Sequence, residues 1–263
     1  GIRISSGKYI YFADADDFCE KDLISTCVAV AEKKNCDIVI FGFNKVNQVG
    51  RKVASIIPES FVINSLLYNR DKIVKILSSG TGLAVWDKLF KSNLIKDNYI
   101  LFDKKKRGQD FTFVFCCFEK ADSVCSVRAT LYNYRINFRA GNKFDNQIII
   151  NHINNYSLIK NFFGPASIWP GDIKKYMDNL FILWFITVIP INIANTRSLN
   201  KDEKVDFFNK LISSDEFLKQ IANIRTGHLS LKNFLLYMIG RTKNPIVLLF
   251  LGKILNSLRK IWY

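Results

Sequence analysis

Residues 8–17, Lys-Tyr-Ile-Tyr-Phe-Ala-Asp-Ala-Asp-Asp, join an apolar, aromatic run to three carboxylates: Asp14, Asp16 and Asp17. The run over residues 9–13 has the composition of a buried strand. In open α/β sheets, ligands bind just beyond the carboxyl ends of the strands. Three carboxylates crowded there repel one another unless a cation or a donor-rich ligand lies among them. The segment therefore predicts an α/β sheet with a divalent cation and a phosphate group at the end of this strand.

The composition sets the class of protein. The 263 residues are enough for one large domain, or for a domain with a helical appendage. A hydrophobic content of 49% and an aromatic content of 14% indicate a real core and exclude a disordered chain. The net charge of +15 favours anionic partners, whether nucleic acid, anionic lipid headgroups or phosphorylated substrates. The charge alone does not choose among them.

Cysteine usage and the chain ends add further expectations. The six cysteines form no CxxC pair, so we expect reduced thiols in a cytosolic compartment and no zinc site. No signal peptide precedes the acidic segment, and the chain begins with Gly1. We therefore expect a fragment or a processed product. The longest apolar run, residues 180–191, is shorter than the ~18 residues of a membrane-spanning helix and contains Pro190, which favours a core helix.

Hydrophobic periodicity divides the chain near residue 140. The part before it alternates between helix and strand, with helices expected at residues 23–31, 70–77 and 110–121, a hairpin or loop at 45–60, and strands at 37–43 and 124–136. The part after it is expected to be helical throughout, at residues 148–163, 173–189, 204–212, 216–224 and 229–239.

The last stretch, residues 245–263, mixes apolar and basic residues and ends in Trp262 and Tyr263. This composition suits a helix lying on an anionic membrane surface. It equally suits a C-terminal helix packed on the body of the protein with a solvated basic face. The sequence leaves both interpretations open.

The acidic motif has three interpretations when it is taken alone. It is a solvated surface turn, in which Asp is common, and the chain is then a basic, non-enzymatic membrane- or nucleic-acid-binding protein. It is the start of a haloacid-dehalogenase-type phosphatase, with Asp14 as nucleophile and Asp16 as acid/base, although the later Gly171-Asp172 with Asp178 matches that pattern poorly. It is a metal site in which two carboxylates hold Mg²⁺ or Mn²⁺ while a nucleotide diphosphate fills the other positions.

Four segments in order favour the last interpretation. They are residues 1–17, the stretch Val-Trp-Asp-Lys-Leu-Phe-Lys-Ser at 85–92, Gly-Gln-Asp-Phe-Thr-Phe at 108–113, and Leu-Tyr-Asn-Tyr-Arg at 131–135. Together these segments resemble the family 2 glycosyltransferases. The resemblance implies a GT-A (Rossmann-like) mixed sheet that lacks its first strands. It assigns residues 1–140 to the C-terminal part of a glycosyltransferase domain and leaves residues 141–263 as a helical region.

The resemblance also implies the chemistry and its residues. An inverting transferase would move a sugar from a nucleotide-sugar donor to a hydroxyl, with Asp14 and Asp16 holding Mg²⁺ or Mn²⁺ in a DxD motif and Asp110 as general base. Asp17 and Arg135 would join Asp14 at the donor diphosphate. The acceptor would meet Trp86, Lys88 and Gln109, where Gln109 replaces the family's glutamate and removes a charge.

The family context implies the partners and the location. The acceptor is expected to be a saccharide or a lipid-linked saccharide, as in the assembly of bacterial surface polysaccharides. The protein is expected to be cytoplasmic and peripheral on the inner face of the membrane. Nucleic acid is not expected as a partner, because the aromatic residues lie in apolar runs and form no evident stacking platform.

Overall fold

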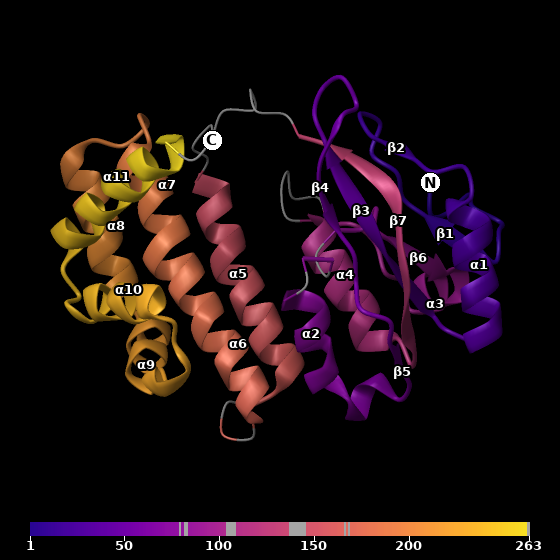
Figure 1. Ribbon diagram of the computed structural model, residues 1–263. Helices are drawn as coiled ribbons and strands as arrows, with labels where there is room; N and C mark the ends of the chain where they lie inside the picture. Colours follow the sequence, from indigo (N-terminus) through magenta and orange to yellow (C-terminus); the bar gives the residue numbers. More distant parts are fainter. Residues whose placement is uncertain are drawn as a thin grey trace. The chain divides into compact units, whose positions relative to one another are not determined.

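The computed structural model describes residues 1–78, 80–81, 84–103, 109–136, 146–165, 167 and 169–261. It divides into two compact units, Gly1–Gly141 with Asn161–Phe163 and Asn142–Lys160 with Gly164–Tyr263 (Figure 1). The first unit is α/β and the second is helical. The boundary predicted near residue 140 falls within residues 137–145, which lie outside the described residues.

The first unit is built on a mixed, seven-stranded sheet. Its strands are β1 (Tyr9–Tyr11), β2 (Phe18–Cys19), β3 (Ile38–Val46), β4 (Lys52–Ile56), β5 (Val62–Ile63), β6 (Lys88–Lys91) and β7 (Val124–Arg135). The order is β1-β6-β3-β7-β2, with β4 paired to β3 and β5 to β7. Strands β3 and β7 are parallel, and the other pairs are antiparallel. The predicted fold class, a mixed α/β sheet followed by helices, is confirmed.

Helices cover both faces of this sheet (Figure 1). They are α1 (Leu23–Lys34), the 3₁₀ turns at Leu66–Tyr68 and Arg70–Lys72, α2 (Ile73–Ser78), α3 (Ser92–Asp97) and α4 (Gln109–Lys120). Because side chains alternate along a strand, Val39 and Phe41 of β3 pack against α1. On β6, Phe90 instead meets Phe113 of α4 with ring centroids 5.8 Å apart. Strand β3 is buried on both faces, which explains its continuous apolar sequence.

Gly42 interrupts β3 where the pairing with β7 shifts register. A Cβ at this position would lie 2.5 Å from the carbonyl oxygen of Ile56 and 2.9 Å from that of Ala129. Because both neighbours are backbone, we expect Gly42→Ala to lower the free energy of unfolding by about 1–3 kcal/mol, measured by urea denaturation. Ala54→Val, which adds methyl groups at an exposed position of the adjacent β4, is the control and is expected to stay within about 0.5 kcal/mol of the parent. Equal effects of the two changes would contradict this account.

The second unit consists of helices. They are α5 (Asn146–Phe163), α6 (Gly171–Phe181), a π-helical segment η4 (Ile182–Val188), α7 (Ile189–Asn195), α8 (Lys201–Ile212), α9 (Asp215–Asn223), a 3₁₀ turn (Thr226–His228), α10 (Leu231–Arg241) and α11 (Pro245–Ile261). The five helices predicted between residues 148 and 239 are therefore confirmed. Among the described residues, the continuous stretch Gly171–Asn195 is long and apolar enough to cross a membrane, but 67% of its most apolar window is buried. This burial is what a core helix shows.

Candidate active site

The three carboxylates lie on a tight turn that follows β1. The backbone N–H of Asp17 donates to the carbonyl oxygen of Asp14 at 3.3 Å, and β2 begins at the next residue. Each of Asp14, Asp16 and Asp17 offers a carboxylate oxygen, and these oxygens lie within 4.8 Å of one another. Asp14 and Asp16 are exposed, whereas Asp17 is half-buried. The turn thus gathers three negative charges at the end of a strand, as the sequence predicts.

Strand β7 holds this turn in place. The hydroxyl of Tyr132 donates to Oδ2 of Asp17 at 2.8 Å, and the backbone N–H of Arg135 donates to Oδ1 of the same residue at 2.7 Å. The N–H of Asp14 in turn donates to the Tyr132 hydroxyl oxygen at 3.3 Å. Both oxygens of Asp17 therefore already accept hydrogen bonds, so this residue fixes the turn. Asp14 and Asp16 present their carboxylates to solvent.

Asp110 stands in the first turn of α4 and interacts electrostatically with the acidic turn. Burial raises the pKa of Asp14, and the charges of Asp110, Asp17 and Asp16 raise it further. The Asp110 carboxyl is half-buried, and that burial raises its own pKa, while the Lys88 ammonium opposes the rise. Two elements far apart in sequence thus bring a fourth carboxylate within electrostatic reach of Asp14.

Lys88 forms a buried ion pair with its neighbour Asp87. The two side chains have no exposed area, and Nζ of Lys88 lies 2.5 Å from Oδ1 of Asp87. The same ammonium donates to the carbonyl oxygens of Thr81 (2.8 Å) and Ala84 (2.6 Å). Burial raises the pKa of Asp87 to about 6 against the pull of Lys88. The sequence places Lys88 at the acceptor, but the structure places its ammonium in the interior, within electrostatic reach of Asp110.

Trp86 lies in an aromatic stack. Its ring is parallel to Tyr132 and Tyr134, with centroids at 4.7 and 5.4 Å, and perpendicular to Phe43 at 4.7 Å. Trp86 is only 8% exposed, whereas Tyr134 is 37% exposed. Burial raises the pKa of Tyr134, and so do the charges of Asp17, Asp16 and Asp14, which indicates that its hydroxyl lies near the acidic turn. Tyr134, which the sequence analysis named only within the segment at 131–135 and gave no role of its own, therefore lies near the acidic turn. The sequence signal for this arrangement is the spacing of two residues between Tyr132 and Tyr134, which places both rings on one face of a strand.

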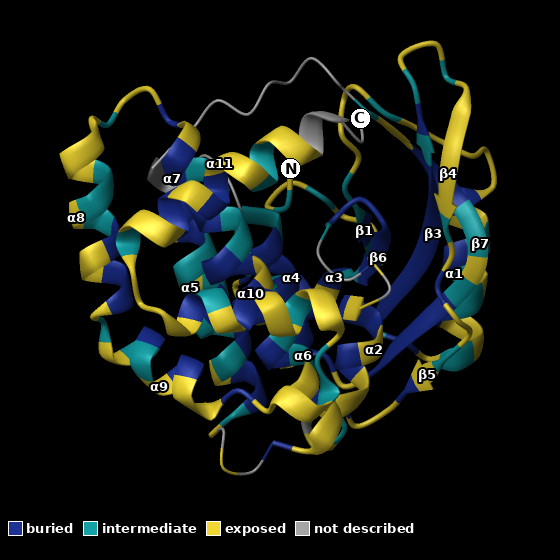
Figure 2. Ribbon diagram, turned by 60° about the vertical axis from the view of Figure 1, so that its left-hand side comes forward, coloured by how far each residue is buried: buried dark blue, intermediate teal, exposed yellow. Residues whose placement is uncertain are grey.

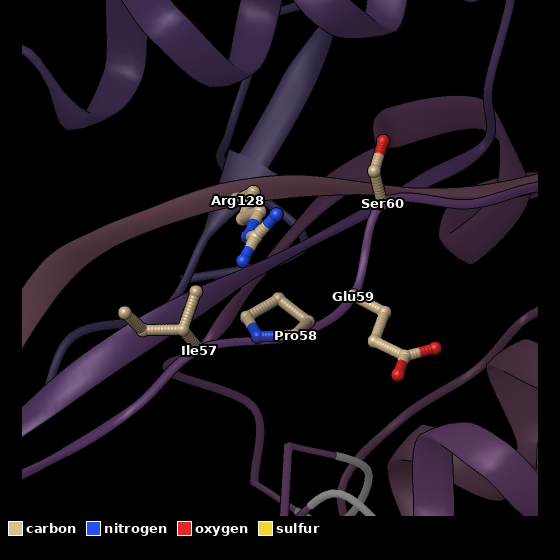
Figure 3. A pocket seen from close by; sticks show the side chains of 5 residues that line it. All are labelled: Ile57, Pro58, Glu59, Ser60 and Arg128. Atoms are coloured by element: carbon tan, nitrogen blue, oxygen red, sulfur yellow. The ribbon is translucent and has the colours of Figure 1, made fainter.

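The remaining predicted residues border the turn and α4. Arg135 is exposed, and its guanidinium lies 5.3 Å from the ring centroid of Phe18. Gln109 is half-buried at the start of α4. Elsewhere on this unit, a shallow hollow of about 330 Å³ is lined by Ile57, Pro58, Glu59, Ser60 and Arg128 (Figure 3). Its lining shares no residue with the acidic turn.

The mixed sheet with an acidic turn after a strand is similar to the GT-A glycosyltransferase fold. Residues 1–94 match the model of the family described as "Glycosyl transferase family 2". The chain is also similar to two curated bacterial proteins. One is an uncharacterized glycosyltransferase EpsJ of Bacillus subtilis (28% identity, 52% of this chain, 40% of the relative), and the other is the glycosyltransferase GlyA of Streptococcus pneumoniae (25%, 52% and 20%). Residues 1–94 of the chain therefore match part of a family 2 glycosyltransferase domain.

Solved structures agree on the fold. The crystal structure of Staphylococcus aureus TarS, residues 1–349, is similar over 98% of this chain and 68% of its own length, with a TM-score of 0.61 and 17% identity. A TarS structure in complex with UDP-GlcNAc is similar over 98% and 70%, with a TM-score of 0.59 and 16% identity. The chain spans only 20–40% of the length of the curated relatives it matches.

The structure does not support the phosphatase interpretation, because Asp178 is engaged in other contacts. That interpretation needs a later acidic residue beside the first motif, for which the sequence offers Asp178. In the structure Asp178 is fully buried in the helical unit, where it pairs with Lys174 and accepts from the N–H of Arg225 at 3.1 Å. The match of residues 1–94 to the glycosyltransferase family model favours glycosyl transfer over the phosphatase interpretation.

Proposed function

We propose that the protein carrying this chain transfers a sugar from a nucleotide-sugar donor to a hydroxyl acceptor with inversion at the anomeric carbon. The observation that carries the proposal is that Asp110 of α4 lies within electrostatic reach of Asp14 in the acidic turn. A carboxylate facing a diphosphate site is suited to receive the proton of an attacking hydroxyl. The structures of TarS with UDP and with UDP-GlcNAc support a nucleotide-sugar donor.

In this proposal the bonds change in one displacement. The acceptor oxygen forms a bond to the anomeric carbon as the bond from that carbon to the diphosphate oxygen breaks. The acceptor proton passes to the carboxylate of Asp110, and the electron pair of the broken bond leaves with the nucleoside diphosphate. Inversion follows because the acceptor attacks opposite the leaving group. Arg135, together with Asp14 and Asp17 of the turn, is proposed to border that diphosphate.

The residues of the turn fit a divalent cation. Three carboxylate oxygens within 4.8 Å of one another are the ligands that Mg²⁺ and Mn²⁺ prefer. Burial, and then the neighbouring carboxylates, raise the pKa of Asp14, and a bound cation would offset this repulsion. Because the oxygens of Asp17 are engaged by β7, Asp14 and Asp16 are the proposed ligands. A bound cation would neutralise the charge that develops on the diphosphate leaving group.

Titration with Mn²⁺ tests this metal site on the chain itself. We expect Asp16→Asn to weaken Mn²⁺ binding about tenfold or more, because a charged ligand is lost. Since the pKa of Asp14 is raised, protons compete with the metal, and the affinity of the parent is expected to fall as the pH is lowered through that pKa. Free Mn²⁺ is measured by electron paramagnetic resonance.

Asp22→Asn serves as the control for this titration, because it removes the same charge from an exposed position outside the turn. It is expected to bind Mn²⁺ as the parent does. Equal weakening in the two variants, or binding that is independent of pH, would contradict the assignment.

The acceptor side is proposed on the same geometry. Gln109 lies next to Asp110, and Tyr134 presents a partly exposed ring supported by the buried Trp86. We therefore propose that Trp86 reaches the acceptor through Tyr134, and that Lys88 acts on it through Asp110. A saccharide or lipid-linked saccharide, used in surface polysaccharide synthesis on the cytoplasmic side of the membrane, is the proposed acceptor.

A further inference from the structure

Helices α10 and α11 each carry an exposed apolar stripe. On α10 it comprises Leu231, Phe234, Leu235 and Met238, and on α11 Ile246, Phe250, Ile254 and Leu258. The spacings of three and four residues place each set on one side of its helix. Phe250 is 65% exposed and Leu235 is 55% exposed, so these are large apolar side chains in contact with water.

The opposite sides of both helices are fixed to the helical unit. A Cβ at Gly240 of α10 would lie 2.6 Å from Cδ1 of Ile186, and a Cβ at Gly252 of α11 would overlap the backbone of Pro190 in α7. These approaches show that the glycine side of each helix packs closely on the unit, against backbone in the case of α11. The exposed stripes therefore belong to the folded state of this unit.

Every charged residue within α10, α11 and the turn that joins them is basic. After Glu216 the sequence contains no further acidic residue, while basic residues recur at Lys219, Arg225, Lys232, Arg241, Lys243, Lys253, Arg259 and Lys260. Lys232, Arg241, Lys243 and Lys253 are exposed on α10, on α11 or in the turn that joins them. The two helices are consecutive and in contact, and Figure 2 shows exposed residues in yellow along both of them. A second copy of the chain would bring two basic faces together, whereas an anionic surface complements them.

We propose that α10 and α11 together form a docking surface for an anionic lipid bilayer. The apolar stripes enter the boundary between headgroups and acyl chains, and the lysines and arginines meet the lipid phosphates. The sequence suggests membrane contact only for the last helix. The proposed surface also includes α10. It would hold the chain at the place where a lipid-linked acceptor resides. Membrane binding by this surface does not depend on the transfer reaction, so the absence of transferase activity would not contradict the proposal.

Sedimentation of the chain with phosphatidylglycerol–phosphatidylcholine vesicles tests this surface. The parent is expected to bind these vesicles, to bind phosphatidylcholine alone at least tenfold more weakly, and to be released by salt. Leu235→Glu and Phe250→Glu are each expected to weaken binding at least tenfold, because each puts a charge into a stripe. Val49→Glu, at an exposed apolar site of the other unit, changes the charge equally and is expected to bind as the parent does.

Three results would overturn the proposal. One is binding at parental strength by either stripe variant, and the second is equal loss in the Val49→Glu control. The third is a parent protein that does not bind vesicles but forms a dimer in analytical ultracentrifugation, with the dimer dissociated by Phe250→Glu. Circular dichroism spectra and thermal melts that match the parent show that each variant is folded.

Discussion

Replacing Asp110 by asparagine is expected to lower kcat for sugar transfer by about 10²–10⁴-fold, the usual contribution of a positioned general base. Asparagine keeps the size of the side chain in the first turn of α4 but cannot take the acceptor proton. The variant is assayed in the protein that carries this chain, with a labelled nucleotide sugar. Donor affinity is expected to change little, because Asp110 belongs to the acceptor side of the proposed site.

The control for this measurement is Asp97→Asn, which removes an exposed carboxylate from the last position of α3. It is expected to keep parental activity. Full activity of Asp110→Asn, measured with the same donor and acceptor, would refute the base assignment, and an equal loss in both variants would point to net charge instead.

The second large effect is expected from Lys88→Met. Removing the ammonium leaves the fully buried carboxylate of Asp87 without its counter-charge, and its Oδ2 already lacks a hydrogen-bond partner among the described residues. Breaking a buried pair in this way costs about 3–5 kcal/mol of unfolding free energy, measured by urea denaturation. The carbonyl oxygens of Thr81 and Ala84 lose the same donor.

A double-mutant cycle isolates the pair. The doubly substituted chain, Asp87→Leu with Lys88→Met, is expected to be more stable than Lys88→Met alone, because no buried charge remains unpaired. If the two single effects simply add, the ion pair is not the source of the loss.

Activity provides an independent measurement of Lys88. Its ammonium opposes the rise in the pKa of Asp110, so its removal raises that pKa further. A base works only when it is deprotonated, and the acid limb of kcat/KM is therefore expected to move to higher pH in a folded Lys88→Met protein. If the acid limb of kcat/KM stays at the same pH in Lys88→Met, the electrostatic link between Lys88 and Asp110 is contradicted.

The sequence predicts the elements whose pattern is local. The strands at residues 37–43 and 124–136 and the helix at 110–121 show clear periodicity over seven or more residues, and all three are confirmed. Strand β6, four residues inside the Trp86–Ser92 motif, was not predicted, because so short a run has no period to detect. The acidic turn was predicted from a simple rule, a strand that ends in carboxylates.

The details of the site depend on contacts between distant segments. No local pattern reveals that both oxygens of Asp17 are bonded to β7, that Lys88 is buried against Asp87, or that Tyr134 covers Trp86. These contacts depend on the register of β7 and on side-chain packing. Neither can be inferred from a short stretch of sequence. The roles assigned to the site residues stay predictions until the variants are measured.

The anchoring of the acidic turn also bears on how the protein is made. The turn comes within the first seventeen residues of the chain, yet its hydrogen-bond partners lie 115 and 118 positions later. A ribosome must therefore release nearly the whole α/β unit before the carboxylates acquire their final geometry. Until β7 pairs, three uncompensated acids stand at the end of a nascent strand with nothing to orient them, and closing so long a loop is slow. Cation binding at this turn would thus report the completion of folding of the first unit.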